Sequence, residues 1–139
     1  MNQEYLKKQI EQLAAELDTL IRIIEDSDEN ENSFGGIELV NMGLMEALNI
    51  NLEEINNIPL EHFIAHITID NQLNNANLDL LADLLFKTAR VFEKQQDKEN
   101  AKRLFHRTLQ IYMYLAKAEV DFPFERHLRI KELREILLQ

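Results

Sequence analysis

The apolar residues at the start of this chain recur with the period of an α-helix, and no other feature of the sequence restricts the fold as strongly. Six of them follow one another at intervals of 4, 3, 4, 3 and 4 residues: Leu6, Ile10, Leu13, Leu17, Leu20 and Ile24. We call these six residues the seam, because their spacing is that of the a and d positions of a coiled coil. The face that they form must be buried. The segment is therefore expected either to pack along its own domain or to pair with a second copy of itself.

The rest of the chain also favours helices over strands. Its 139 residues include only 3 Gly and 2 Pro, and no run of β-branched residues is bounded by turn signals. Apolar residues recur with helical spacing over residues 37–48, 60–67, 78–92, 101–112 and 124–137. The length suits one domain. The sequence therefore predicts a single all-α domain over residues 1–139, with about six helices.

One segment has the composition of an exposed loop. Residues 26–36 are rich in Asp, Glu, Asn and Ser and end in Gly35-Gly36. Such a segment has too little apolar surface to order itself by burial, and paired glycines are typical of turns. We expect an acidic, solvated loop after the N-terminal amphipathic helix.

Residues 77–117 are predicted to form a helical hairpin. Asp97 is placed to cap the second helix, and a connection as short as Gln95-Gln96 requires the two helices to lie antiparallel. A last helix follows Pro123, and its apolar positions are Phe124, Leu128, Ile130, Leu133, Ile136 and Leu137. We expect this helix to close the exposed side of the hairpin.

The hairpin resembles the tetratricopeptide helix pair. The resemblance is carried by small and large residues at the spacing of that repeat: Leu85, Thr88, Ala89, Phe92, Ala101 and Phe105. It implies that the two helices approach closely at Ala89 and Ala101. Thr88-Ala89 stands where Leu-Gly is usual, Thr108 stands where Ala is usual, and no Pro closes the unit. Arrays of about three such repeats build concave peptide-binding surfaces, whereas only one is detectable here.

The order of elements along nearly the whole chain resembles that of a small uncharacterised bacterial family of all-helical proteins. The similar segments are the opening helix, with Tyr5-Leu6 and Gln9-Ile10-Glu11-Gln12-Leu13, and the Leu-rich stretch Leu48-Asn49-Ile50-Asn51-Leu52. Members end in one tetratricopeptide-like hairpin. The resemblance implies no known activity, substrate or catalytic residue.

Candidate chemistry is confined to one short segment. His62 and His66 lie four residues apart, followed by Asp70, and this spacing places two imidazoles on one helical face, as zinc and di-metal sites require. The same residues also form a polar stripe opposite an apolar face, which is the simpler interpretation. The chain has no Cys, no nucleophile elbow and no phosphate-binding loop. We expect no cofactor and no enzymatic activity; the alternative is a metal-binding protein or enzyme using His62 and His66.

Charge is distributed unevenly and bears on the partners. Residues 1–76 contain 15 acidic and 3 basic residues, whereas residues 77–139 contain 10 acidic and 12 basic ones. This balance argues against nucleic acid and anionic membranes as partners, and the basic residues of the hairpin are either a solvated face or a seat for the acidic half. No apolar run approaches the roughly 18 residues of a membrane span. Together with the lack of Cys, this leads us to predict a cytoplasmic protein.

The function predicted from these features is that of a non-enzymatic protein interaction or assembly module whose partner the sequence does not identify. The candidate partner-binding residues are four apolar and two basic residues of the hairpin: Leu85, Phe92, Phe105, Tyr112, Arg103 and Arg107. The alternative contact is a homodimer through the N-terminal helix.

Overall fold

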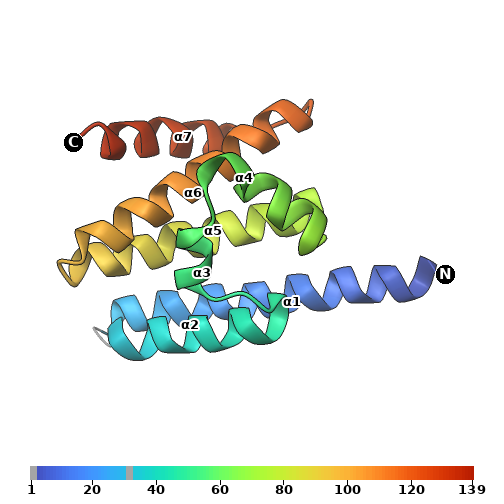
Figure 1. Cartoon of the computed structure of the whole chain (residues 1–139), viewed down its shortest axis with the longest axis horizontal. Helices are drawn as coiled ribbons and strands as arrows, with labels where there is room; N and C mark the ends of the chain where they lie inside the picture. The colour runs from blue at the N-terminus through green and yellow to red at the C-terminus, as the bar shows by residue number, and fades with distance from the viewer. Residues whose placement is uncertain (1–2, 31–32) are drawn as a thin grey trace.

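The computed structural model describes residues 3–30 and 33–139 and is helical throughout this part of the chain (Figure 1). Seven α-helices and one π-helical turn, η1, are found there, and the described residues contain no strand. Their bounds are α1 Gln3–Glu29, α2 Ser33–Leu48, α3 Leu52–Asn57, α4 Leu60–Ala65, η1 His66–Asp70, α5 Asn75–Lys94, α6 Lys98–Ala118 and α7 Phe124–Leu137. The predicted all-α fold is confirmed.

The five long helices lie side by side in one row, in the order α2, α1, α5, α6, α7 (Figure 1). Helices α1, α5 and α7 run in one direction and α2 and α6 in the opposite one. The short elements α3 and α4 pack against α6, and η1 continues from α4. The buried apolar side chains form one cluster that includes residues of α1 and of α7. Because α5 lies at the centre of the row, it is the helix on which its neighbours on both sides pack.

The predicted hairpin of residues 77–117 corresponds to α5 and α6. Each of its helices begins at a polar cap: the side chain of Asn74 accepts a hydrogen bond from the amide of Asn77, and Asp97 accepts one from the amide of Asn100. The rings of Phe86 and Phe105 meet edge to face across the hairpin, with centroids 5.7 Å apart. Local capping and apolar spacing thus suffice to define this unit.

The acidic loop predicted over residues 26–36 is mostly helix. Helix α1 continues to Glu29 and α2 begins at Ser33, while residues 31–32 lie outside the described part of the chain. The reason is a close approach of α2 to α1. Ser27 is buried, and a Cβ atom on Gly36 would lie only 2.3 Å from the Cβ of Ser27. Gly36 is therefore a packing residue inside a helix rather than part of a turn.

Helix α7 closes the hairpin with only part of the apolar positions predicted for it. Ile130 and Leu133 are buried against the rest of the protein, and α7 packs on α6. Phe124 and Leu128 point outward, with 71% and 52% of their surface exposed. The sequence did not show this because α7 carries apolar residues on both faces, so its periodicity does not select one of them.

Arg107 holds the linker of α3 and α4 onto α6. Its guanidinium is buried, with 5% of the residue exposed, and it donates hydrogen bonds to three carbonyl oxygens at the end of α3: those of Ile55 (3.1 Å), Asn56 (2.9 Å) and Ile58 (2.6 Å). It also lies over the ring of Phe63, 5.4 Å from the centroid. The carbonyls at a helix C-terminus carry partial negative charge, so they compensate this buried cation without a carboxylate.

Arg107→Met is expected to lower the free energy of unfolding by at least about 2 kcal/mol, because it leaves three buried carbonyl oxygens without their donor. Urea unfolding followed by circular dichroism measures this. The matched control is Arg103→Met on the same helix, where the exposed guanidinium pairs with the exposed Glu99, so a loss below about 0.5 kcal/mol is expected. Equal losses in the two variants would contradict the anchoring role of Arg107.

Candidate interaction surfaces

The six hairpin residues predicted to bind a partner do not form one surface. Leu85, Phe105 and Tyr112 are buried in the core, and Arg107 is used inside the molecule as described above. Phe92 is partly buried, and Arg103 is exposed and pairs with Glu99 at 2.8 Å. The hairpin lacks an open apolar face at these positions because α1 packs on α5 and α7 packs on α6. Sequence spacing identifies apolar faces but not what covers them.

The histidine segment is only partly assembled. His62 is exposed on α4, whereas His66 begins the π-helical turn and its Nδ1 lies 3.1 Å from Oδ1 of Asn71. His66 Nε2 and the carboxylate of Asp70 are 3.8 Å apart. Nowhere in residues 3–30 and 33–139 do three or more His, Cys, Asp or Glu side chains form a group that could hold a metal ion. No observation therefore favours the metal-binding alternative.

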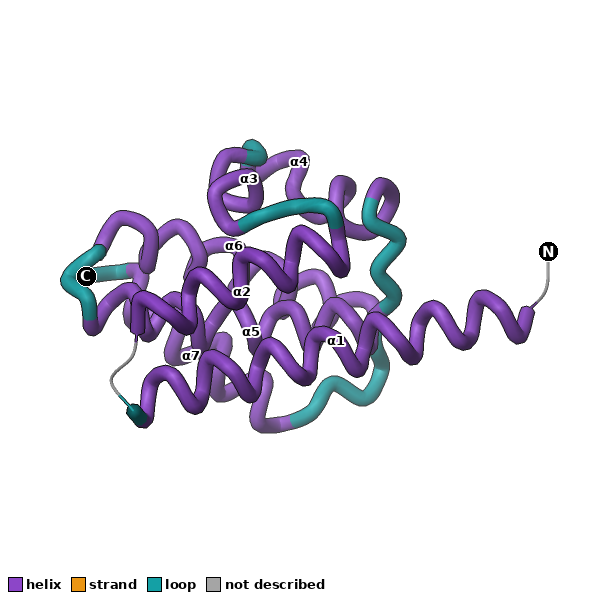
Figure 2. Tube along the Cα trace, turned by 90° about the horizontal axis from the view of Figure 1, so that it is seen from below, coloured by secondary structure: helices purple, strands orange, loops and turns teal. Residues whose placement is uncertain are grey.

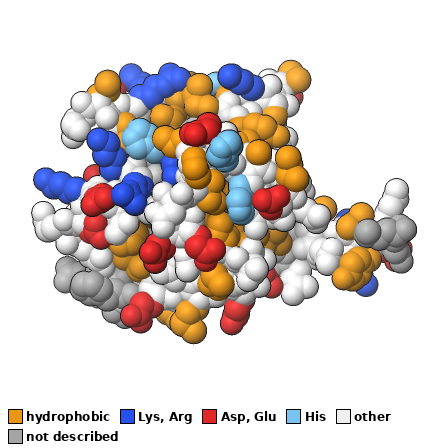
Figure 3. All heavy atoms as spheres, viewed as in Figure 1, with side chains coloured by type: hydrophobic (Ala, Val, Ile, Leu, Met, Phe, Trp, Pro, Cys, Tyr) orange, Lys and Arg blue, Asp and Glu red, His pale blue; other side chains and the backbone are white. Residues whose placement is uncertain are grey.

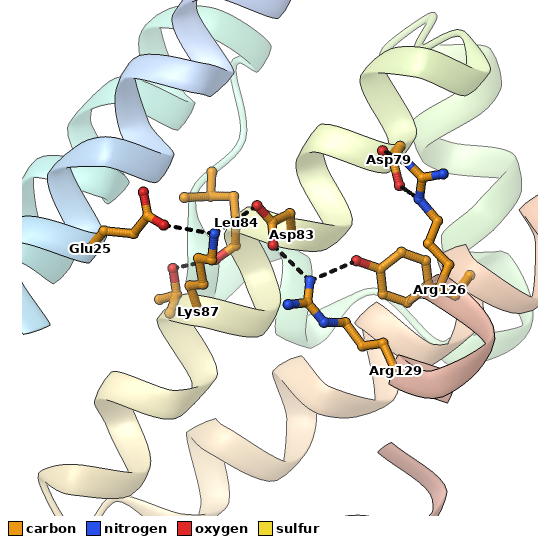
Figure 4. A network of polar contacts seen from close by, with 9 residues as sticks. Glu25, Asp79, Asp83, Leu84, Lys87, Arg126 and Arg129 are labelled. Atoms are coloured by element: carbon orange, nitrogen blue, oxygen red, sulfur yellow. Dashed lines mark hydrogen bonds and ion pairs between the residues drawn. The ribbon is translucent and has the colours of Figure 1, made fainter. Parts of the chain in front are cut away.

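Helix α5 carries a stripe of charged residues that joins it to α1. Lys87 donates to the carboxylates of Glu25 (2.9 Å) and Asp83 (3.0 Å) (Figure 4). Lys94 donates to Asp28 (2.6 Å). Burial by itself lowers the pKa of Lys87, but its hydrogen bonds to Glu25 and Asp83 outweigh this and raise it. The basic residues on this side of the hairpin are thus a seat for acidic residues of the first half of the chain.

The same stripe joins α5 to α7. Arg129 donates to Asp83 (2.7 Å) and to the hydroxyl of Tyr112 (3.2 Å), and Arg126 pairs with Asp79 (Figure 4). The guanidinium of Arg129 also lies 4.3 Å from the centroid of the Phe86 ring. Burial raises the pKa of Tyr112 despite the hydrogen bond from Arg129, so this phenol stays protonated at neutral pH. These two arginines hold α7 on α5. Because their guanidinium groups already pair with Asp79 and Asp83, they are not available to bind an external anion.

In the described part of the chain, α1, α2 and α7 each carry an exposed apolar surface. The first is the N-terminal end of α1, residues 3–12, which extends beyond the other helices and in which every residue is exposed (Figure 2). We call this segment the arm; it carries the first two residues of the seam beside Tyr5, which is 56% exposed. The second is the outer face of α2, with Leu39, Met42 and Met45, and the third is the outer face of α7. All three lie on elements at the periphery of the row.

A cavity of about 400 Å³ lies where the arm leaves the body. Leu6, Ile10 and Leu13 line it from α1, and Ala47 and Asn77 contribute to the opposite wall. Asn77 is 1% exposed; its amide nitrogen donates to the carbonyl oxygen of Ile10 (3.3 Å), while its own Oδ1 has no hydrogen-bond partner. The base of the arm therefore borders both unfilled space and an unsatisfied acceptor.

No known protein family, no curated protein and no solved structure matches the chain. The function of these surfaces is therefore inferred from their own chemistry. Among the helices of the described residues, none combines the length and the apolar character needed to cross a membrane.

Asp83→Ala is expected to loosen α7, because it removes the carboxylate that Arg129 and Lys87 share and leaves Arg129 partly buried without its anion. We expect faster amide hydrogen exchange in α7 and a loss of about 1 to 2 kcal/mol in the free energy of unfolding. The control is Glu99→Ala, which breaks an ion pair within α6 alone. Unchanged exchange in α7 of the Asp83 variant would show that the network does not hold this helix.

Proposed function

We propose that this protein is a non-enzymatic assembly module and that its arm binds the arm of a second copy. The observation that supports this is the division of the seam. Leu17, Leu20 and Ile24 are buried in the body, whereas Leu6 and Ile10 continue the same apolar line along the arm with 41% and 40% of their surface exposed. In this proposal the hairpin, which resembles the tetratricopeptide pair, is a scaffold rather than a peptide groove, and the protein acts in the cytoplasm.

The charge of the arm supports a second copy as the partner. Residues 3–12 contain two acidic and two basic residues, Glu4, Glu11, Lys7 and Lys8, whereas the whole chain has a net charge of −10. Two copies repel each other over most of their surfaces, but this repulsion is absent between their arms. The neutral, apolar arm is thus suited to self-contact.

Electrostatics also favours an antiparallel arrangement of the two arms. A parallel pairing would bring two acidic bodies together, whereas an antiparallel pairing about a two-fold axis keeps them at opposite ends. The tip of each arm then reaches the cavity at the base of the other. A polar hydrogen from the incoming arm would there satisfy Oδ1 of Asn77, whose burial without a donor costs about 1 to 3 kcal/mol.

The contact is short, which sets its expected strength. Ten residues of α-helix span about 15 Å, so the area buried is expected to fall below the roughly 1,200 Å² of the smallest stable interfaces. We therefore expect a reversible dimer whose population rises with concentration. The closed two-fold symmetry limits this contact to two copies.

The test is sedimentation equilibrium over a range of concentrations up to about 1 mM, the Kd of a weak complex. The wild-type mass is expected to rise with concentration from 16.4 kDa toward twice that value. Leu6→Gln with Ile10→Gln is expected to move the midpoint of the monomer–dimer transition to a concentration at least tenfold higher. Both side chains are exposed, so the double variant should keep the wild-type helix content.

Lys8→Gln with Ala15→Gln is the matched control, because both residues are exposed and lie on the side of α1 opposite the seam. It should dimerise as the wild type does. A wild type that stays monomeric across the range, or an unchanged midpoint in the Leu6 and Ile10 variant, would overturn the proposal.

A further inference from the structure

The cavity at the base of the arm carries negative charge. Eleven residues line it, and none of them is Lys, Arg or His. Two are glutamates from different helices, Glu16 on α1 and Glu46 on α2. Within residues 3–30 and 33–139 neither of these carboxylates forms an ion pair. The cavity therefore holds two negative charges that no ion pair of the described chain neutralises.

Asn77 adds a buried acceptor to the same cavity. The residue is 1% exposed, and its Oδ1 has no hydrogen-bond partner among the described residues. Its amide nitrogen donates to the carbonyl oxygen of Ile10 (3.3 Å), so turning the amide over would place two acceptors against each other. A buried acceptor without a donor is destabilising. This oxygen requires a hydrogen that comes from outside the chain.

The walls between these polar groups are apolar and held in place. The α1 side carries the first three residues of the seam, and Ala47 contributes from α2. Asn71, which follows η1, lines the cavity as well. Its Nδ2 donates to the carbonyl oxygen of Leu48 (2.9 Å), and its Oδ1 lies 3.1 Å from Nδ1 of His66. A ligand of this cavity therefore needs an apolar body in addition to hydrogen-bond donors.

Size and chemistry together define the class of ligand. At about 30 Å³ for each water-sized group, the volume of about 400 Å³ accommodates about a dozen non-hydrogen atoms. An ammonium group has three donors and no acceptor, so it suits both carboxylates and the oxygen of Asn77. Two carboxylates match two ammonium groups, and an alkyl chain between these groups can lie on the apolar wall as the stem of a lysine does. An aliphatic diamine or polyamine meets all of these requirements.

The charge around the cavity attracts such a cation from a distance. Ten of the eleven lining residues belong to residues 1–76, which contain 15 acidic and 3 basic residues. Figure 3 shows Asp and Glu side chains toward the α2 edge of the molecule and Lys and Arg toward the α7 edge. The potential of the acidic half raises the local concentration of cations and repels anions.

We propose that this cavity binds an aliphatic diamine or polyamine, and that the bound amine excludes the arm of a second copy. One ammonium group donates to Oδ1 of Asn77, Glu16 and Glu46 balance the charge, and the alkyl chain packs on the seam. Binding of the amine does not depend on the arm contact. The exclusion rests on the proposed function, because the tip of the second arm needs the same space and the same acceptor.

The direct test is a titration with 1,4-diaminobutane followed by NMR. At about 50 µM protein, well below the Kd of about 1 mM of a weak complex, the chain is monomeric. The side-chain amide signals of Asn77 are expected to shift and to saturate below about 10 mM amine. Asn56 is the matched control, because it is also buried and its Oδ1 also lacks a partner, but it lies on α3 away from the cavity. Its signals should not move.

Two further probes separate the parts of the ligand. Mg²⁺ has the same charge without the alkyl chain, and 1,4-butanediol has the chain without the charge. Neither should shift the Asn77 signals over the same range. The absence of a saturable shift with the diamine, or an equal shift with either probe, would overturn the site.

Substitution of the two carboxylates tests their role. Glu16→Gln with Glu46→Gln is expected to raise the Kd of the diamine at least about tenfold, because it removes both charge-assisted hydrogen bonds. The matched control is Glu11→Gln with Glu38→Gln, which changes the net charge equally on the same two helices at exposed positions outside the cavity. Its Kd should stay within about twofold of the wild-type value. Equal effects of the two pairs would show attraction to overall charge only and would overturn the site.

A lysine side chain of a protein partner offers a single ammonium group on a similar alkyl chain. The amide of Nα-acetyl-lysine, titrated in the same way, is expected to bind at least about fivefold more weakly than the diamine, because it leaves one carboxylate without a partner. Equal affinity would assign the site to a lysine side chain and overturn the diamine.

The exclusion is tested by sedimentation equilibrium of the wild type with saturating 1,4-diaminobutane, compared with MgCl₂ at equal ionic strength. The diamine is expected to move the monomer–dimer midpoint to a concentration at least about threefold higher, by mass action on the monomer. An unchanged midpoint would overturn the exclusion. A chain that never dimerises would overturn it together with the proposed function, whereas the NMR result on amine binding would stand.

Discussion

The position of α5 between α1 and α6 is the constraint on which the rest of this structure depends. Half of its 20 residues are buried, most of them apolar, and both flanking helices pack on it. Each fully buried Leu or Phe side chain contributes about 1.5 to 3 kcal/mol, whereas a half-exposed ion pair contributes about 0 to 1 kcal/mol. Core packing therefore sets which helices meet. The charged stripe of Asp79, Asp83 and Lys87 adds ion pairs from α5 to α1 and to α7.

Helix starts that carry a side-chain cap could be predicted from the sequence because they depend on local chemistry, whereas the end of α1 and the start of α2 were wrongly predicted as loop. Asn51 and Glu54 form the capping box that starts α3, and Asp97 caps α6 as expected. The covered faces could not be predicted in the same way. Leu128 and Leu133 are the same residue type within α7, yet the first is 52% exposed and the second is buried. Only the tertiary contacts distinguish them, because α7 has apolar residues on more than one side.

Residue type also gave wrong predictions at two positions, Gly36 and Arg107, whose role is in packing inside the protein. Gly36 resembles a turn signal but allows α2 to approach Ser27 closely. Arg107 belongs by sequence to a cluster of basic residues on the hairpin, yet it alone of that cluster is buried on backbone carbonyls. Its neighbours pair with acidic residues instead: Lys87 with Glu25, and Lys94 with Asp28. The basic cluster is thus divided between a buried anchor and a set of ion pairs, a division that charge counting does not reveal.

The lengths of the first two helices explain why the seam has two environments. Helix α1 has 27 residues and α2 has 16, so α1 is longer by 11 residues, or about 16 Å of helix axis. The part of the seam alongside α2 and α5 is buried, whereas Leu6 and Ile10, toward the N-terminal end of α1, are exposed. A seam of this kind can pack within its own domain or pair with a second copy. These two arrangements are therefore not exclusive, because different parts of one seam can adopt each of them. The first is observed from Leu13 onward, where the side chains pack against the core, and the second is what we propose for Leu6 and Ile10, which are exposed.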